Sequence, residues 1–141
     1  MAAINLTSEG TAPAAASRAA RSIWIGRIVS GLGVLFLSFD LSVKLLQGKE
    51  AIEGTVQLGY AVSVIRPLGI LQLVLLALYL VPRTALLGAV LWTGYLGGAV
   101  ATHVRVGNPL VSHVLFPVYV AALLWGGLWL RDRRTRALLA P

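Results

Sequence analysis

One acidic and one basic side chain lie four residues apart near the end of the chain's first long apolar run. Asp40 and Lys44 fall on the same face if this run is a helix. A carboxylate that deep in a bilayer costs roughly 2.5–3.5 kcal/mol, so it should face other helices and have a partner. Two readings stay open. The pair stabilises the helix end, or Asp40 holds a proton or a polar ligand group while Lys44 tunes its pKa.

Other polar side chains reach a similar depth when the later apolar runs are laid beside the first as antiparallel helices. Tyr95, Ala99 and Thr102 recur at helical spacing and give one run a polar stripe. Such a stripe either joins helices by hydrogen bonds or lines a pocket for a lipophilic molecule with a polar head. The main candidate site residues are Asp40, Lys44, Gln72, Tyr95 and His103, and the secondary candidates are Arg27, Thr102, His113 and Tyr119.

Arg27 and the two histidines each have a simpler reading. Arg27 lies about one turn inside the other end of the first run, where it either extends to the membrane surface or faces the bundle. It is about 20 Å from Asp40 along the helix, too far for pairing. His103 and His113 are expected to bond loop groups or water, and either can shuttle protons. A haem between them would need porphyrin-sized space.

The composition places the chain in a membrane. Of 141 residues 57% are hydrophobic and 12% charged, against about 25% charged in soluble domains. The net charge of +7 comes from basic residues at the ends of apolar runs, which favours contact with anionic lipid and argues against nucleic acid. With no cysteine and two histidines, we expect no metal site and no disulfide or iron–sulfur cluster, so any redox role needs a borrowed electron carrier.

The stretch from Pro82 to Gly107 is the clearest membrane span. It carries no charge between Arg83 and His103, which is about 20 residues or roughly 30 Å as a helix. Gly94 and Gly98 have the G-x-x-x-G spacing of close helix contacts, so we expect them to pack against another helix.

The whole pattern predicts an all-α, integral membrane four-helix bundle. A disordered cytoplasmic tail is expected over 1–21 and a C-terminal tail over 137–141. The expected spans are 23–46, 65–81, 84–104 and 110–130. Residues 47–64 form a loop in which the spacing of Glu50, Glu53, Gln57 and Tyr60 predicts one polar side of a short interfacial helix. Tight turns follow at 82–83 and 106–109, and Pro117 should bend the last span.

Charge bias predicts that both termini lie in the cytoplasm. The predicted inner side holds Arg18, Arg21, Arg83 and four arginines after the last span. The predicted outer side holds Lys49, Arg66 and Arg105, partly offset by Glu50 and Glu53. Because cytoplasmic loops carry the excess of Lys and Arg, the orientation is N-in and C-in, in an inner or plasma membrane.

Several stretches together resemble the DoxX-like family of small four-helix membrane proteins. They are WIGRIVSGLGVLFLSFDLSVKL in the first span, LGY before the second, LGILQLVLLALYLVPRTALLGAVLWTGYLGGAVATHVRVG through the third, and LFPVYVAALLWGGLWLRDRR at the end. The resemblance covers roughly 22–136, with 82–107 its most specific part. In the family pattern a Glu often stands where this chain has Gln72, and an Arg recurs at the place of Arg27. The resemblance implies a four-helix inner-membrane protein, with some relatives linked to quinone-dependent or stress functions.

No catalytic motif accompanies these features. The chain has no nucleophile–base pair, paired carboxylates or phosphate-binding glycine loop at motif spacing. The first hypothesis is therefore a membrane protein that binds a lipophilic ligand such as a quinone, as a subunit of a redox system. The second is a non-catalytic scaffold, which docks a membrane-protein partner or another copy through its glycines. A small transporter is a third, supported only by Pro117.

Overall fold

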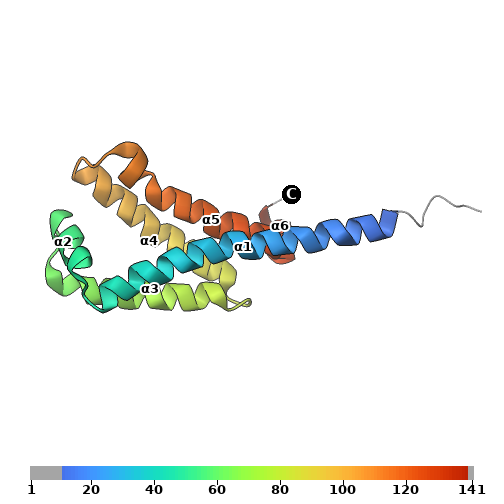
Figure 1. Cartoon of the computed structure of the whole chain (residues 1–141), viewed down its shortest axis with the longest axis horizontal. Helices are drawn as coiled ribbons and strands as arrows, with labels where there is room; N and C mark the ends of the chain where they lie inside the picture. The colour runs from blue at the N-terminus through green and yellow to red at the C-terminus, as the bar shows by residue number, and fades with distance from the viewer. Residues whose placement is uncertain (1–10, 140–141) are drawn as a thin grey trace, which may run out of the picture.

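The computed structural model describes residues 11–139, and this part of the chain folds into helices and turns (Figure 1). Its elements in chain order are α1 (Thr11–Leu45), α2 (Lys49–Gln57), the 3₁₀ turn η1 (Val62–Val64), α3 (Ile65–Leu80), α4 (Ala85–Arg105), the π-helical turn η2 (Leu110–Val114), α5 (Phe116–Arg131) and α6 (Arg133–Leu139).

Four helical segments of the described chain are long and apolar enough to cross a bilayer. They are Ala16–Leu45, Val62–Leu80, Ala85–Arg105 and Leu110–Arg131. In lipid every backbone N–H and C=O must be bonded inside the segment, which is why apolar runs of this length become helices. The predicted all-α, four-helix membrane bundle is confirmed, and the span beginning at Val62 is the shortest of the four, as expected.

The first helix begins at Thr11, well before the predicted start of the first span at 23. Residues 11–21, predicted to belong to a disordered tail, form the first turns of α1, while 1–10 lie outside the described residues. This segment has no apolar face, but it is rich in alanine, the best helix former, so it continues the helix beyond the bundle. At the other terminus α6 extends through 137–139 of the expected tail, and 140–141 are outside the described part.

The predicted turns are confirmed, with one correction. Thr84 closes the turn after Pro82 by donating its backbone N–H to Val81 and its hydroxyl to the Leu78 carbonyl oxygen. Gly107, at φ 69°, ends α4 in the left-handed region. Pro117 lies in the first turn of α5 after the π-helical turn η2, so the span is interrupted before the proline rather than bent at it.

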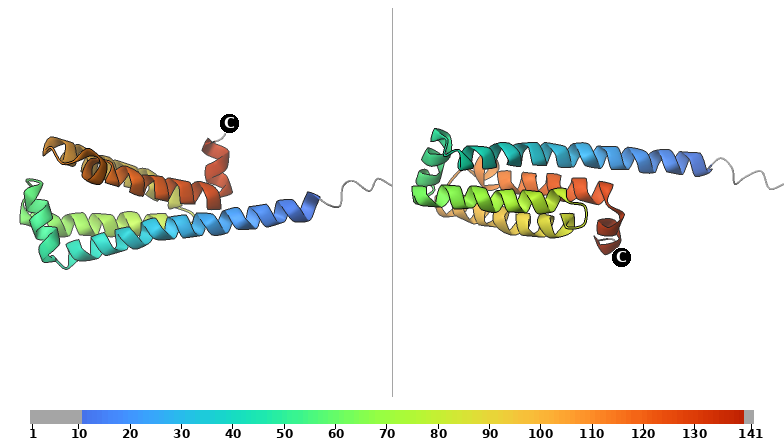
Figure 2. Two further views of the ribbon diagram at one scale, coloured as in Figure 1. Left: turned by 45° about the horizontal axis from the view of Figure 1, so that its top comes forward. Right: turned by 90° about the horizontal axis from the view of Figure 1, so that it is seen from below.

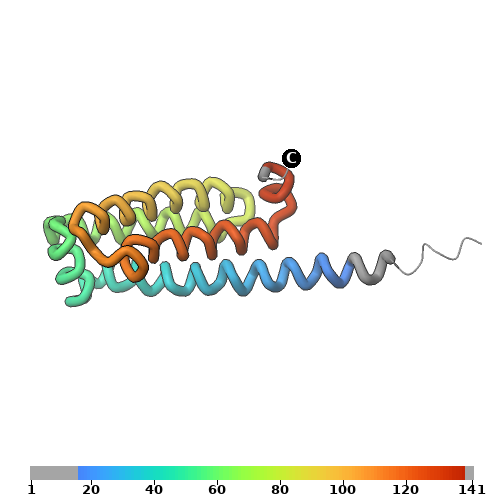
Figure 3. The backbone as a smooth tube through the Cα atoms, turned by 90° about the horizontal axis from the view of Figure 1, so that it is seen from above, coloured from blue at the N-terminus to red at the C-terminus, as the bar shows by residue number. Residues whose placement is uncertain are grey.

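Four helices pack side by side with α1 and α4 diagonally opposed. Helix α1 contacts α3 and α5, and α4 contacts the same two helices. The alternating directions bring the N-terminal part of α1 and the end of α5 to the same end of the bundle, which we call the terminal end (Figure 2). Helix α2 and η2 lie at the opposite end, which we call the α2 end (Figure 3).

Small residues bring the helices into close contact at the terminal end. A Cβ atom on Gly26 would lie 2.8 Å from the Gly127 carbonyl oxygen, and one on Gly127 would lie 2.6 Å from the Ser30 nitrogen, so α1 and α5 meet through backbone. A Cβ on Gly88 would lie 2.5 Å from the Tyr79 nitrogen, so α3 and α4 meet in the same way. Close backbone contact of this kind is the usual basis of helix association in lipid.

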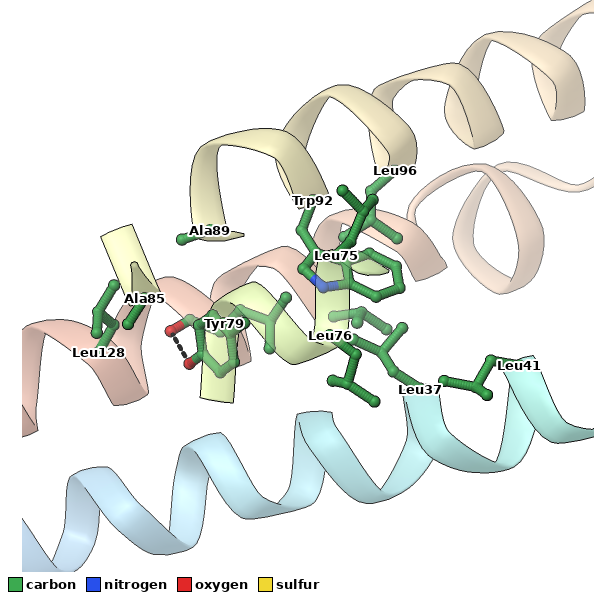
Figure 4. Packing of buried hydrophobic residues seen from close by; sticks show 12 residues of the cluster. Leu37, Leu41, Leu75, Leu76, Tyr79, Ala85, Ala89, Trp92, Leu96 and Leu128 are labelled. Atoms are coloured by element: carbon green, nitrogen blue, oxygen red, sulfur yellow. Dashed lines mark hydrogen bonds between the residues drawn. The ribbon is translucent and has the colours of Figure 1, made fainter. Parts of the chain in front are cut away.

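The buried core lies between the four helices and is dominated by aromatic and leucine side chains (Figure 4). Trp92 and Tyr79 are fully buried. The Tyr79 hydroxyl donates to the Leu124 carbonyl oxygen at 2.8 Å and lies 3.0 Å from the Ser30 hydroxyl. This polar bridge ties α3 to both α5 and α1, because a buried hydroxyl in an apolar core needs a partner.

Replacing Gly88 with alanine should destabilise the bundle, whereas the same change at Gly97 in the same helix should not. The alanine methyl at 88 meets the Tyr79 backbone and forces the helices apart, which typically costs about 1–3 kcal/mol. At 97 no described atom lies within 4 Å of the new methyl. Thermal unfolding of both variants in detergent checks this. Equal unfolding temperatures would contradict the backbone contact.

Candidate functional site

Helices α4 and α5 diverge from α1 and α3 toward the α2 end (Figure 1). A cavity of about 800 Å³ lies at this end. Its walls come from α1, α3, α4 and the start of α5. Helix α2 also lines it, at the end of the bundle, and we call α2 the lid. Apolar side chains make much of the wall, among them Phe36 and Phe116, whose rings meet edge to face at 5.0 Å. We call this space the wedge cavity. Its volume falls within the range of small-molecule sites.

All five main candidate residues line the wedge cavity, together with Thr102 and His113 of the secondary set. They come from α1, α3 and α4 and from the π-helical turn η2, segments far apart in sequence. Side chains that the sequence predicted at similar depth in the membrane therefore line one space. Whether that space is a functional site stays a prediction.

Asp40 is the centre of the polar contacts in this cavity. Its Oδ2 atom accepts a short hydrogen bond from the Lys44 ammonium and a second from the Gln72 amide nitrogen at 2.6 Å. The expected pair on one helix face therefore forms, and Gln72 adds a link from α1 to α3. The Asp40 side chain is still 33% exposed, so the pair lines the cavity as well as stabilising the helix end.

Three polar atoms beside this network have no partner in the described chain. The Gln72 Oε1 atom is buried without a hydrogen bond, in a residue that is only 1% exposed. No described donor reaches Asp40 Oδ1, and no described group bonds the hydroxyl of the half-buried Tyr95. A buried acceptor left unbonded costs about 1–3 kcal/mol, so the cavity wall has unused bonding capacity.

The two histidines lie together at the mouth of the cavity. Their ring centroids are 5.8 Å apart in an edge-to-face contact, which leaves no room for a porphyrin between them. The Nδ1 atom of His103 bonds the Asn108 amide and that of His113 bonds the Ser112 hydroxyl, both at 2.8 Å. These are the loop contacts expected for interfacial histidines. Among residues 11–139 no group of three or more potential ligand side chains is arranged to hold a metal ion.

Two residues that hold the lid in place, Tyr60 and Arg105, were not singled out as site residues from sequence, whereas Thr102, which Tyr60 contacts, was a secondary candidate. The Tyr60 hydroxyl lies 2.9 Å from the Thr102 hydroxyl, and Arg105 donates to the Leu58 carbonyl oxygen at 2.5 Å. The Arg105 guanidinium also lies over the Tyr60 ring, 5.9 Å from its centroid. These contacts fix the segment after α2 to the end of α4. The amphipathic pattern predicted the short helix but not that it covers a cavity.

Gly94 and Gly98 do not make the close helix contact that their spacing predicted within this chain. No described atom lies within 4 Å of a Cβ built on either residue, so neither packs against a helix of this chain. Both line the wedge cavity instead. Close packing falls to Gly26, Gly88 and Gly127, and at the α2 end to Gly69, where a Cβ would lie 3.2 Å from the Leu45 nitrogen. Gly94 and Gly98 line the space where α4 and α5 diverge from α1 and α3.

The remaining secondary candidates lie away from this cavity. Tyr119 is exposed and is not among the lining residues. Arg27 lies toward the terminal end, where its guanidinium is 5.7 Å from the Trp24 ring and beside a second, smaller hollow.

The comparison with protein families agrees with the expected resemblance. The family model described as the DoxX-like family matches residues 28–127. The chain belongs to the DoxX-like family. The match covers the bundle from within α1 to within α5, so it includes the whole wedge cavity and α2 of this DoxX-like protein. Family and helices together make it a multi-pass membrane protein. No curated protein and no solved structure matches the chain.

Replacing Tyr60 with phenylalanine should loosen the lid without unfolding the bundle. The change removes the hydroxyl that bonds Thr102, a contact worth about 1 kcal/mol, so amide hydrogen exchange over α2 should accelerate about fivefold. Tyr119→Phe is the matched control, since that hydroxyl has no bond within the described chain. Unchanged exchange in α2, or equal acceleration in both variants, would argue against the lid contact.

Proposed function

We propose that this DoxX-like protein binds a small lipophilic molecule with a polar head, of the quinone class, in the wedge cavity. The protein would lie in the inner or plasma membrane with both termini in the cytoplasm, as a subunit of a membrane redox system. One observation carries the proposal: polar side chains with unpaired atoms line a largely apolar cavity of suitable size.

The chemistry of the wall fits a quinone and its reduced form. A quinone carbonyl accepts hydrogen bonds, and Tyr95 offers a hydroxyl that is unbonded within the described chain. A quinol hydroxyl donates, and Gln72 Oε1 and Asp40 Oδ1 are acceptors without described partners. Phe36, Phe116 and their apolar neighbours are suited to the ring and tail.

Two groups at the site are suited to hold a proton. Asp40 accepts from Lys44 and Gln72 through one oxygen, which leaves Oδ1 for a proton or for a ligand hydroxyl. His103 also lines the cavity, and its imidazole has ring nitrogens that can accept or donate a proton. Electrons would come from a partner protein, because the chain contains no cysteine with which to hold an iron–sulfur cluster.

Asp40→Asn should abolish retention of the ligand while leaving the bundle folded. The change keeps the shape of the side chain but removes the charge that holds Lys44 and orders the polar wall. The measurement is mass spectrometry of lipophilic molecules extracted from the purified protein. Glu53→Gln is the charge-matched control, because Glu53 is an exposed residue of α2 that pairs with Lys49 at 3.8 Å and does not line the cavity.

The expected result is a quinone-class molecule in the parent and in Glu53→Gln, and none in folded Asp40→Asn. Bulk phospholipid alone in all three proteins would contradict the proposal. An Asp40→Asn variant that fails to insert or fold would favour the purely structural reading of the Asp40–Lys44 pair.

A scaffold function is the second candidate, and an exposed glycine face supports it. A Cβ on Gly94, Gly97 or Gly98 meets no described atom within 4 Å, so the backbone of another helix could approach α4 closely along this face. The occupant would be a helix of a membrane-protein partner or of a second copy of the chain.

Leucine at Gly98 and leucine at Gly97 should separate the two candidates. Gly98 lines the wedge cavity and Gly97 does not, although they are neighbours with equally open Cβ positions. If the cavity holds a quinone, Gly98→Leu should weaken binding of a short-chain benzoquinone about tenfold or more by filling space, while Gly97→Leu should not. Saturable quenching of tryptophan fluorescence measures this binding. Loss of a co-purifying partner in both variants, with quinone binding unchanged, would favour the scaffold.

A further inference from the structure

A second hollow, of about 380 Å³, lies at the terminal end of the bundle and is strongly basic. It is lined by the guanidinium-bearing residues Arg27, Arg83, Arg131 and Arg134, with Asp132 as the one carboxylate among its lining residues. The arginines come from α1, the α3–α4 turn, the end of α5 and the start of α6. We call this space the arginine hollow. Three of its four arginines lie outside the residues that the family model matches.

None of the four arginines is paired with a carboxylate within the described residues. The two ion pairs of that part of the chain are Lys44–Asp40 and Lys49–Glu53, at the other end of the bundle. Four like charges around one small space repel one another, and water at the exposed Arg27, Arg83 and Arg134 screens only part of that repulsion. The arginine hollow therefore has a net positive charge.

Arg131 carries the least hydrated of these charges. Its guanidinium lies over the Tyr79 ring, 5.1 Å from the centroid, which fixes its orientation. Its Nε and Nη2 atoms are buried without an acceptor in the described chain. A guanidinium so placed is poorly compensated by water, so an anion in the hollow beside it would be favoured.

The carboxylate at this site is already engaged. Asp132 Oδ1 accepts from the Arg134 backbone N–H at 3.0 Å and Oδ2 accepts from the Thr135 hydroxyl at 2.9 Å, so the side chain caps α6. Burial raises the pKa of Asp132, but these hydrogen bonds and the Arg134 charge outweigh it and bring the pKa below its ordinary value. Asp132 is thus ionised but directed at the helix it caps.

The start of α4 adds to the positive potential. Ala85, the first residue of α4, lines the arginine hollow, and no side-chain hydrogen bond caps this helix within the described chain. The N-terminus of a helix carries a partial positive charge and free N–H groups that favour an anion.

We propose that the arginine hollow binds a phosphate-bearing anion. Guanidinium groups match the geometry of phosphate oxygens and bind them through paired hydrogen bonds. The same chemistry is offered by the headgroup of an anionic phospholipid and by free phosphate. The charge bias of the chain predicts that this end lies at the cytoplasmic surface, where both are present.

The test uses the full chain, purified in neutral detergent and stripped of lipid, with two probes. One arm adds inorganic phosphate, and the other adds phosphatidylglycerol in mixed micelles with phosphatidylcholine micelles as reference. Ligand that binds only the folded state raises the unfolding temperature, so thermal unfolding over a concentration series reports the apparent Kd in each arm.

The decisive variants are Arg83→Gln and Arg133→Gln. Both remove one positive charge at the same end from an exposed residue, so both should fold, but Arg83 lines the hollow and Arg133 does not. We expect Arg83→Gln to weaken binding about tenfold and Arg133→Gln to leave it within about twofold. Stabilisation by phosphatidylglycerol alone identifies a lipid headgroup as the ligand, and stabilisation by phosphate identifies a free anion. No stabilisation by either probe, or equal weakening in both variants, would overturn the proposal.

Discussion

Close backbone contact between helices at one end of the bundle determines the shape of everything else in this protein. Lipid tails are as apolar as leucine side chains, so the helices associate where small residues allow their backbones to meet. Gly26 and Gly127 provide that contact between α1 and α5, and Gly88 provides it between α3 and α4. The Tyr79 hydroxyl, bonded to Leu124 and Ser30, joins the two pairs near the same end. From this end α4 and α5 diverge from α1 and α3, and the wedge cavity lies where they are apart (Figure 1).

The polar groups of the spans are placed where this shape can accommodate them. Asp40 would be costly against lipid, but in the diverging half it lies between α1 and α3, with Lys44 and Gln72 bonded to one oxygen. The cavity also keeps polar atoms that the protein itself leaves unbonded, notably Gln72 Oε1. The packed core holds such an atom as well, Trp92 Nε1, but Gln72 lines an open cavity, where a bound molecule could supply the missing partner. The presence of such atoms beside an open, apolar space is the physical basis for proposing a ligand.

The two ends of the bundle therefore offer contrasting environments. The wedge cavity at the α2 end has an internally balanced ion pair, aromatic walls and a short helical lid anchored through Tyr60 and Arg105. The arginine hollow at the terminal end is lined by guanidinium groups without a carboxylate partner in the described chain, and Asp132, beside them, caps α6. A lipophilic molecule suits the first, and an anion suits the second.

The sequence by itself determined the class of the protein, its four spans and their turns, because these depend on local hydropathy and turn chemistry. Helical spacing placed Asp40 and Lys44 on one face, but it left open whether the two pair or whether Asp40 serves a pocket. The approximate depth of each polar side chain could also be read from the sequence, and it grouped most of the polar candidates that line the wedge cavity, although Tyr119, at a similar depth, does not line it. The sequence did not separate packing glycines from cavity glycines: Gly94 and Gly98 have the expected spacing, yet the close contacts are made by glycines without that motif. Only the tertiary structure decided this, because whether a helix face meets a neighbour or open space depends on how all four helices cross.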